Sequence, residues 1–140
     1  MIGDAVVGAG ELNEFLHAAF PGAPRGYGVE VVTDRGVRLR MPVGDQHGRP
    51  GGTVSGPTMM SLADAAAWLA TLSRIGIVPL AVTSNLTIHF LHKPELGVDL
   101  YADAELLRLG ARSSVTDVRI TSGIDGPMVA AASVGYSIPA

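Results

Sequence analysis

The sequence predicts an α+β domain in which an antiparallel sheet wraps around one buried helix. The only long helical pattern lies in the middle of the chain, at residues 57–73, and is rich in alanine. After Pro79 the sequence alternates between apolar and polar residues, which is typical of strands. These strand patterns follow one another without helices between them, whereas parallel strands would need a helical crossover for each pair.

The first part of the chain predicts one helix and a hairpin. Residues 10–20 carry apolar side chains at helical spacing, and Pro21 follows directly. A loop rich in Gly and Pro follows. Residues 29–33 and 37–41 are then separated by Asp-Arg-Gly, which indicates a hairpin of two strands with one solvent-exposed face. Residues 42–55 contain four glycines and are expected to form an irregular loop.

The central helix is expected to be buried. Pro57 suits its first turn, because the N–H that proline lacks would find no helical partner there. One stripe of the helix is wholly apolar, and a second stripe contains Asp64, the only acid in the helix. The helix contains five alanines, so other backbone can approach it closely on several sides.

Three or four further strands are expected in the second half of the chain. They are predicted at residues 82–90, 98–106, 113–122 and 128–138, with turns rich in Gly between them. The second of these patterns alternates most regularly. Their succession predicts neighbouring antiparallel strands.

The composition indicates a protein that associates with copies of itself. Of its 140 residues, 47% are hydrophobic and 16% are charged, against about 25% charged in typical soluble domains. The chain shows neither an apolar run long enough for a membrane span nor a signal peptide, so we expect a cytoplasmic protein without a membrane partner. One domain over residues 1–140 fits this length, with residues 1–27 as an N-terminal helix and loop.

Charge and cysteine content exclude several functional classes. The net charge is −3 and the basic residues are scattered, which argues against a nucleic-acid partner. The chain has no cysteine, so disulfides, thiolate metal ligands and a cysteine nucleophile are excluded. The four histidines show no metal-binding spacing, and we expect neither a metal nor a bound cofactor.

Asp64 is the residue that most needs an explanation. No Lys or Arg lies one turn away on its own helix, and burying an unpaired carboxylate is costly. Such an acid can act in catalysis as a base or as a nucleophile. It can also reach solvent or a backbone donor and be purely structural, which is the commoner case for acids at unusual positions.

The start of the same helix could stabilise an oxyanion. A helix N-terminus presents free N–H groups, and Gly56 allows a carbonyl to approach the backbone closely. Capping by Ser55 or Gly56, with Pro57 as the first helical residue, explains the same residues, and both interpretations can hold. Gly56 and Asp64 lie roughly 12 Å apart along the helix axis, so one carbonyl cannot touch both. If they cooperate, the acid must come from a second chain, as in a two-fold dimer.

Residues 55–66 resemble the His-Gly-Gly, four-residue, Leu-Ala-Asp helix of hotdog-fold acyl-CoA thioesterases of the phenylacetic-acid-degradation type. Residues 82–97 are similar to the next strand of that family and to its Phe-Leu-basic-Pro exit. Residues 109–112 and 129–132 are similar to its later strand junctions. The resemblance covers approximately residues 29–138 and implies the hotdog fold, an antiparallel sheet around one long central helix.

The resemblance also implies a reaction, the hydrolysis of an acyl-CoA thioester to free acid and coenzyme A. Asp64 matches the acid that attacks the thioester or activates water. Gly56 of the other subunit matches the glycine whose N–H polarises the thioester carbonyl. Thr83 matches a hydroxyl that holds the water, with Ser84 as a near alternative. Coenzyme A enters only as part of the substrate.

Two departures from the family pattern bear on the oxyanion site. Ser55 replaces the His of the motif, and Pro57 removes one N–H, so the site would rest on Gly56 and Thr58. The other residues expected to bind substrate are Arg49, Met60, Ser84, His92, Lys93 and Arg112. The last three are basic residues that could meet the phosphates of coenzyme A.

Two other functions remain open. A hotdog-fold hydratase or dehydratase pairs an acid with a His, and Ser55 at the nearest position argues against it. A non-catalytic acyl-CoA-binding protein would keep the fold without turnover. In each case the expected partners are a small-molecule acyl-CoA and further copies of the chain, as a homodimer or a homotetramer built from two dimers. The sequence does not fix the acyl group.

Overall fold

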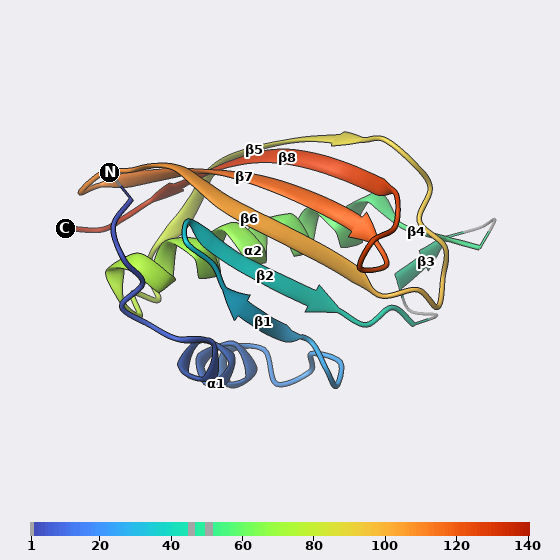
Figure 1. Ribbon diagram of the computed structural model, residues 1–140, viewed down its shortest axis with the longest axis horizontal. Helices are drawn as coiled ribbons and strands as arrows, with labels where there is room; N and C mark the ends of the chain where they lie inside the picture. The colour runs from blue at the N-terminus through green and yellow to red at the C-terminus, as the bar shows by residue number, and fades with distance from the viewer. Residues whose placement is uncertain (1, 45–46, 50–51) are drawn as a thin grey trace.

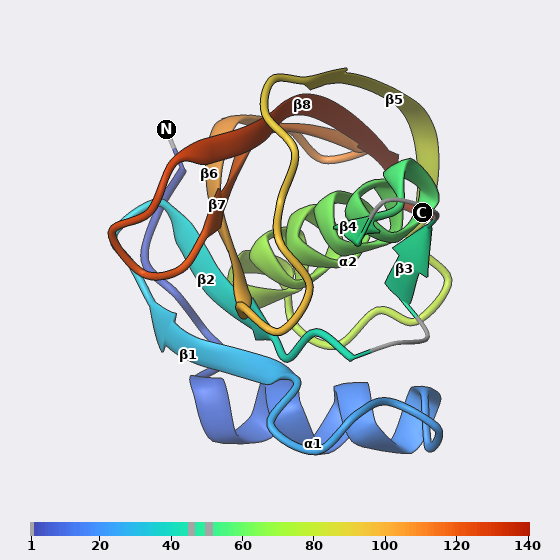
Figure 2. The ribbon, with the colours of Figure 1, turned by 90° about the vertical axis from the view of Figure 1, so that its right-hand side faces the viewer.

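The computed structural model describes residues 2–44, 47–49 and 52–140. In chain order the elements are α1 (Ala9–Ala19), β1 (Gly28–Val32), β2 (Gly36–Met41), β3 (Gly48–Arg49), β4 (Thr53–Val54), α2 (Gly56–Ile75), β5 (Val82–Phe90), β6 (Leu100–Leu109), β7 (Ser113–Ser122) and β8 (Met128–Ser137). Strands β1, β2, β6, β7, β8 and β5 form, in this spatial order, one antiparallel sheet that curves around α2 (Figures 1 and 2). The predicted α+β class, with a sheet wrapped around one long helix, is confirmed.

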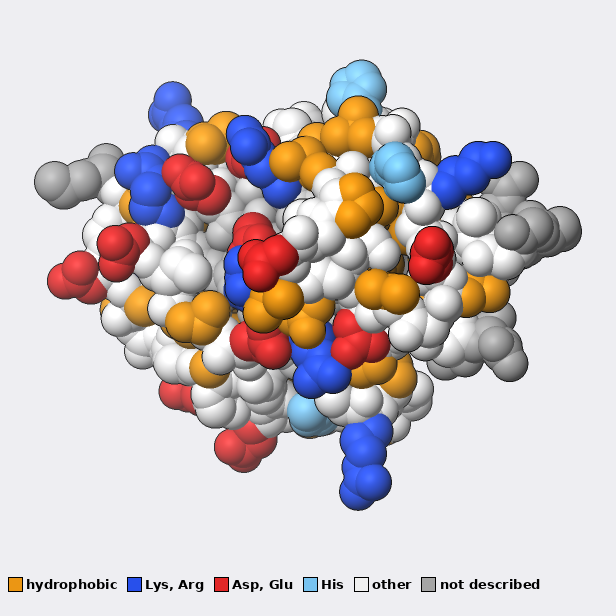
Figure 3. Space-filling model, turned by 45° about the vertical axis from the view of Figure 1, so that its right-hand side comes forward, with side chains coloured by type: hydrophobic (Ala, Val, Ile, Leu, Met, Phe, Trp, Pro, Cys, Tyr) orange, Lys and Arg blue, Asp and Glu red, His pale blue; other side chains and the backbone are white. Residues whose placement is uncertain are grey.

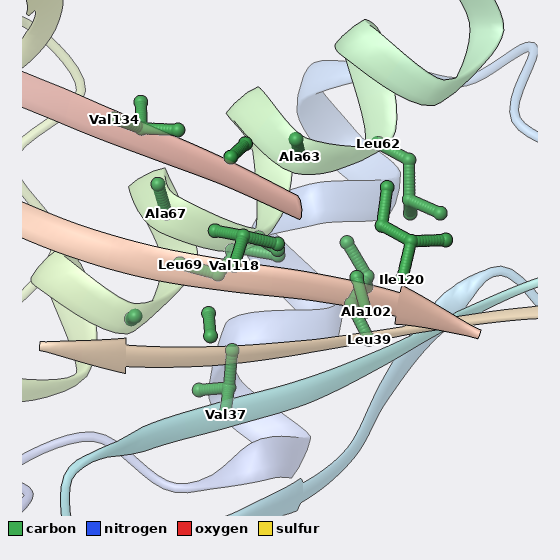
Figure 4. Close-up of a cluster of buried hydrophobic side chains, with 14 of the residues drawn as sticks. Val37, Leu39, Leu62, Ala63, Ala67, Leu69, Ala102, Val118, Ile120 and Val134 are labelled. Carbon is green, nitrogen blue, oxygen red and sulfur yellow. The ribbon is translucent and has the colours of Figure 1, made fainter. Parts of the chain in front are cut away.

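Helix α2 is the centre of the fold. It begins after Ser55, whose hydroxyl accepts a hydrogen bond from the Thr58 N–H, and it ends at Gly76, whose φ of 93° favours glycine. Leu62 and Leu69 are fully buried, and they pack against the concave face of the sheet, which contributes Ile120 (Figure 4). The expectation of a buried rather than a surface helix is confirmed.

Helix α1 packs against β1, the edge strand on the side of the sheet remote from β5 (Figure 2). Leu12 and Leu16 of α1 are fully buried. The Asn13 side chain accepts a hydrogen bond from the Val29 N–H at 2.6 Å and donates one to the Val29 carbonyl at 2.9 Å. This pair of bonds fixes the middle of α1 to the start of β1. Neither of the two described helices is long and apolar enough to cross a membrane.

Strand β5 forms the other edge of the sheet, and most of its side chains are exposed on both faces. Only Leu86 and Ile88 are half-buried. Phe90, the last residue of the strand, is 50% exposed, and Leu91 after it is also exposed. Figure 3 shows hydrophobic side chains together with histidine along the upper edge of the molecule, where β5 runs. An edge strand with this much exposed apolar surface favours a further strand beside it.

The loop over residues 42–55 contains a short pair of strands that the sequence did not predict. Strands β3 and β4 pair antiparallel through Gly48 with Val54 and Arg49 with Thr53. Two residues are too few to show an alternating pattern, so the pair leaves no periodic signal. The pair leads the chain directly into the first turn of α2.

Candidate active site

Two hydroxyl groups bind one oxygen of the Asp64 carboxylate. The Thr83 hydroxyl of β5 donates to Asp64 Oδ1 at 2.6 Å, and the Tyr136 hydroxyl of β8 donates to the same oxygen at 2.8 Å. The Tyr136 oxygen also lies 3.2 Å from the main-chain carbonyl oxygen of Asp64. Among the described residues, Asp64 Oδ2 accepts no hydrogen bond from the protein. The carboxylate therefore has one fixed oxygen and one available oxygen.

A β-bulge at Ser84 explains how Thr83 reaches Asp64. Thr83 pairs with Tyr136, whereas Asn85 pairs with the adjacent Gly135, so Ser84 is an extra residue in the ladder. Side chains alternate along a strand, and one extra residue reverses the alternation. Leu86 and the Thr83 hydroxyl can therefore both face α2, although the two residues are three positions apart in sequence and would face opposite sides of a regular strand.

Tyr136 and Tyr27 are site residues that the sequence interpretation missed. Burial raises the pKa of Tyr136, and its hydrogen bond to Asp64 raises it further, although a bond with Thr83 acts in the opposite direction. Burial and the charge of Asp64 raise the pKa of Tyr27 to about 12. Both phenols are therefore neutral near neutral pH. Among the described residues, hydroxyl groups rather than a cation face the Asp64 carboxylate.

Asp64 lines a cavity of about 700 Å³, within the range of roughly 300–1,000 Å³ that is usual for small-molecule sites. One wall of the cavity is a face of α2 that includes the exposed Ser61 and the half-buried Ala65 and Trp68. The opposite wall comes from Ala19 at the end of α1 and from residues 20–24 and 27, which lie between α1 and β1. A largely apolar cavity with one available carboxylate oxygen is suited to an apolar ligand with a reactive polar centre.

Gly56 faces a different cavity, of about 410 Å³. Its N–H donates to no acceptor within residues 2–44, 47–49 and 52–140, as expected for the first residue of a helix. The ring of Phe90 packs closely against Gly56. A Cβ added at Gly56 would lie 3.2 Å from Phe90 Cζ. Thr58 differs from Gly56, because its N–H is already engaged by Ser55. Within one chain, Gly56 and Asp64 therefore face separate cavities.

The basic residues predicted to bind phosphates do not lie together in one chain. His92 and Lys93 line the cavity of Gly56, just beyond the end of β5. Arg112 donates to the Ile138 carbonyl at 3.3 Å, near the start of β5, where Val82 pairs with Ser137. The two ends of this nine-residue strand are about 27 Å apart.

The remaining residues that were predicted to bind substrate lie on α2, at the bulge of β5 or outside the described side chains. Met60 is 41% exposed on α2, Pro57 is exposed at the start of the helix, and the Ser84 side chain is exposed at the bulge. The side chain of Arg49 lies outside the described residues. The structure also places His47 in the wall of the Asp64 cavity, where its Nδ1 accepts a hydrogen bond from the Gly44 N–H.

The sheet around α2, together with an acid on that helix held by hydroxyl groups, defines a hotdog-fold protein with a candidate hydrolytic site. The family model of the thioesterase superfamily matches residues 51–128, and the chain belongs to this superfamily. The match includes Gly56, Asp64 and Thr83 but neither Tyr136 nor the residues 19–27. A search of curated proteins gave no sequence match.

Solved structures share the fold over four fifths or more of the chain. A candidate thioesterase from Silicibacter sp. TM1040 is 36% identical, with 98% of this chain and 95% of that protein aligned and a TM-score of 0.88. A hypothetical thioesterase from Streptococcus pneumoniae, solved with coenzyme A, is 24% identical over 90% and 95% of the two chains, with a TM-score of 0.79. A Streptococcus mutans protein bound to acetyl-CoA is 23% identical over 82% and 90%, with a TM-score of 0.73.

Proposed function

We propose that the protein is an acyl-CoA thioesterase of the phenylacetic-acid-degradation type, which hydrolyses its substrate to free acid and coenzyme A. The observation that carries the proposal is the Asp64 carboxylate, which lines the cavity, with Oδ1 held by Thr83 and Tyr136 and with no donor to Oδ2 among the described residues. Membership of the thioesterase superfamily supports the reaction class. The reaction requires no redox step, and we propose that it needs no bound cofactor.

Asp64 has two possible chemical roles in this reaction. As a general base, Oδ2 takes a proton from water while the water oxygen attacks the thioester carbonyl carbon. As a nucleophile, Oδ2 attacks that carbon itself and forms a mixed anhydride, which water then hydrolyses. In both routes the carbon–sulfur bond breaks and coenzyme A leaves as its thiol or thiolate. The two donors on Oδ1 orient Oδ2, and this is useful in either route.

The oxyanion that forms on the thioester carbonyl needs a donor, and we propose the Gly56 N–H of a second chain. This N–H points from a helix N-terminus, where the helix dipole also favours negative charge. Within one chain, Asp64 is bonded to Thr83 near the start of β5, whereas Gly56 packs beneath Phe90 at its end. Two β5 edges that pair antiparallel would bring the start of one strand to the end of the other.

The same pairing would assemble the proposed binding site for coenzyme A. It brings Arg112 of one chain toward His92 and Lys93 of the other, so cations from both chains could meet the phosphates. Two proteins with this fold were solved with coenzyme A or acetyl-CoA, which supports a ligand of this class. We therefore propose a cytoplasmic homodimer, or a tetramer of two dimers, with an acyl-CoA as its small-molecule partner.

Complementation between two inactive variants tests this proposal. Asp64→Asn and Gly56→Ala homodimers should each be nearly inactive, measured as release of free coenzyme A from a panel of acyl-CoAs. When equal amounts are mixed and allowed to exchange subunits, half of the dimers are mixed, and each has one intact site. Activity should therefore return to about one quarter of the wild-type value.

The other outcomes contradict specific parts of the proposal. If the mixture stays inactive although subunits exchange, Gly56 and Asp64 do not work across the interface. If the wild type binds acyl-CoAs but hydrolyses none of them, the chain is a binding protein without turnover. The hydratase alternative requires a His beside the acid, whereas the donors found at Asp64 are the hydroxyls of Thr83 and Tyr136.

A further inference from the structure

The segment that closes the Asp64 cavity lies outside the part of the chain that matches the superfamily. Residues 20–27, the Phe20–Tyr27 segment, connect α1 to β1 and face α2 across the cavity. The family model begins at residue 51, so membership of the superfamily does not account for this wall. The role of the segment must be argued from its own contacts.

The Phe20–Tyr27 segment is held in place at both ends. Its first end continues from α1, which the buried Leu16 fixes to the core, and the N–H of Phe20 donates to the carbonyl of that leucine at 2.9 Å. At its second end, His17 Nε2 lies 2.7 Å from the Tyr27 carbonyl oxygen. Two prolines inside the segment restrict its backbone further. The wall is therefore preorganised, which lowers the entropy cost of binding a ligand against it.

Aromatic side chains are concentrated around this cavity. Four of the seven aromatic residues of the chain line it, and they are Phe20, Tyr27, Trp68 and Tyr136. The Phe20 and Trp68 rings meet edge to face with centroids 6.1 Å apart, and Phe15 supports Trp68 from behind at 5.2 Å. Phe20 is nevertheless 50% exposed, so much of its ring is available for contact. Aromatic rings offer large apolar surfaces with few rotatable bonds, which suits an apolar ligand group.

We infer that the Phe20–Tyr27 segment and the Trp68 face of α2 enclose the acyl group of the substrate and set the size of acyl group that the enzyme accepts. This inference rests on the proposed thioesterase function, because it places the thioester carbonyl at Asp64 and the acyl chain in the cavity beyond it. A cavity of about 700 Å³ is much larger than an acetyl group. The substrate class is therefore a thioester with a bulky apolar acyl group rather than acetyl-CoA.

Two neighbouring alanines on α1 provide a matched test. Ala19 and Ala18 are both exposed, but only Ala19 lines the cavity. Ala19→Phe should lower the ratio of kcat/KM for octanoyl-CoA to that for acetyl-CoA by about tenfold or more, because the added ring takes space from the acyl chain. Ala18→Phe should leave this ratio unchanged. Phe20→Ala should raise the ratio of kcat/KM for acyl-CoAs with chains longer than octanoyl to kcat/KM for acetyl-CoA.

A binding measurement separates this inference from the proposed reaction. Trp68 is the only tryptophan of the chain, so its fluorescence reports on this cavity alone. In the Asp64→Asn variant, octanoyl-CoA should change the Trp68 emission at concentrations where coenzyme A alone does not. If the two ligands act alike, or if Ala18→Phe and Ala19→Phe have equal effects, the acyl group lies elsewhere and the inference is wrong. If no acyl-CoA is hydrolysed but the emission responds to octanoyl-CoA, the binding site stands and the proposed reaction fails.

Discussion

The Tyr136 hydroxyl lies 2.8 Å from Asp64 Oδ1, although the two residues are 72 positions apart in the sequence. Tyr136 belongs to β8, and its side chain crosses from the sheet to the central helix. Thr83, its partner in the β5–β8 ladder, donates to the same oxygen. Two adjacent strands thus fix one orientation of the carboxylate, and each donor can be removed without changing the acid itself.

Replacing Tyr136 by Phe should lower kcat by about ten- to a hundredfold with little change in KM, because Oδ2 loses part of its orientation. The ring is only 4% exposed and Phe keeps its packing, so the fold should survive a loss of about 1 kcal/mol from the missing hydrogen bond. Steady-state kinetics and thermal unfolding measure the two effects. Tyr101→Phe on β6 is the control, because Tyr101 is not among the residues that line the Asp64 cavity. Unchanged kcat in Tyr136→Phe would show that the phenol is only structural.

Asp64→Asn should lower kcat by about a thousandfold or more, since the amide can serve neither as base nor as nucleophile. The amide oxygen can still accept the hydrogen bonds of Thr83 and Tyr136, so the oligomeric state should match that of the wild type. Single-turnover reactions of the wild type in ¹⁸O water, followed by mass spectrometry, distinguish the two roles. Label incorporated into Asp64 would rule out a pure general-base route, whereas label in the product acid alone would mean that water attacks the acyl carbonyl carbon.

Gly56→Ala should lower kcat by about a hundredfold, because a methyl group would block the approach of the carbonyl oxygen to the N–H. The added Cβ would also lie 3.2 Å from Phe90 Cζ, so displacement of this ring is a competing explanation. The double variant Gly56→Ala with Phe90→Leu separates the two causes. Recovery of activity in the double variant would mean that Gly56 acts only through Phe90.

The stability of the protein should fall as the pH rises from about 10 toward about 12. The pKa of Tyr27 is raised to about 12 and that of Tyr136 is also raised, so the unfolded chain loses these protons first. The stabilisation from the two protonated tyrosines is thus fully present below the tyrosine pKa of the unfolded chain. It is lost as the pH rises from that value through the raised pKa values of the folded chain. Urea unfolding at about pH 9 and about pH 11 should show a smaller loss for Tyr27→Phe than for the wild type. Equal losses would contradict a raised pKa of the half-buried Tyr27.

Most of the fold could be predicted from the sequence because its elements follow simple periods. The strand expected at residues 113–122 matches β7, and the helix expected at 57–73 lies inside α2. The exposure of β5 could not be predicted in the same way. Its alternation suggests one buried face, but it lies at the sheet edge and only Leu86 and Ile88 are half-buried. A sequence period reports which residues share a face and does not report what covers that face.

The candidate site could be predicted only where the residues are close in sequence. Asp64 and Gly56 lie on one helix, so their separation follows from helix geometry. Tyr136 reaches Asp64 only through the register of β5 against β8, and no local pattern near Tyr136 indicates that contact. Tyr27 reaches the cavity through the docking of α1, which depends on the bonds between Asn13 and Val29. Such tertiary relationships carry no signal within a short stretch of sequence.

The bulge at Ser84 makes the site depend on the length of β5 as well as on its composition. Deletion of Ser84 alone would change no residue known to touch Asp64, yet it would restore simple alternation and turn the Thr83 hydroxyl to the opposite face. A related chain that is one residue shorter here must supply its hydroxyl from the neighbouring position. Alignment gaps in this strand therefore mark a change in the geometry of the acid, even between chains that share every polar residue of the site.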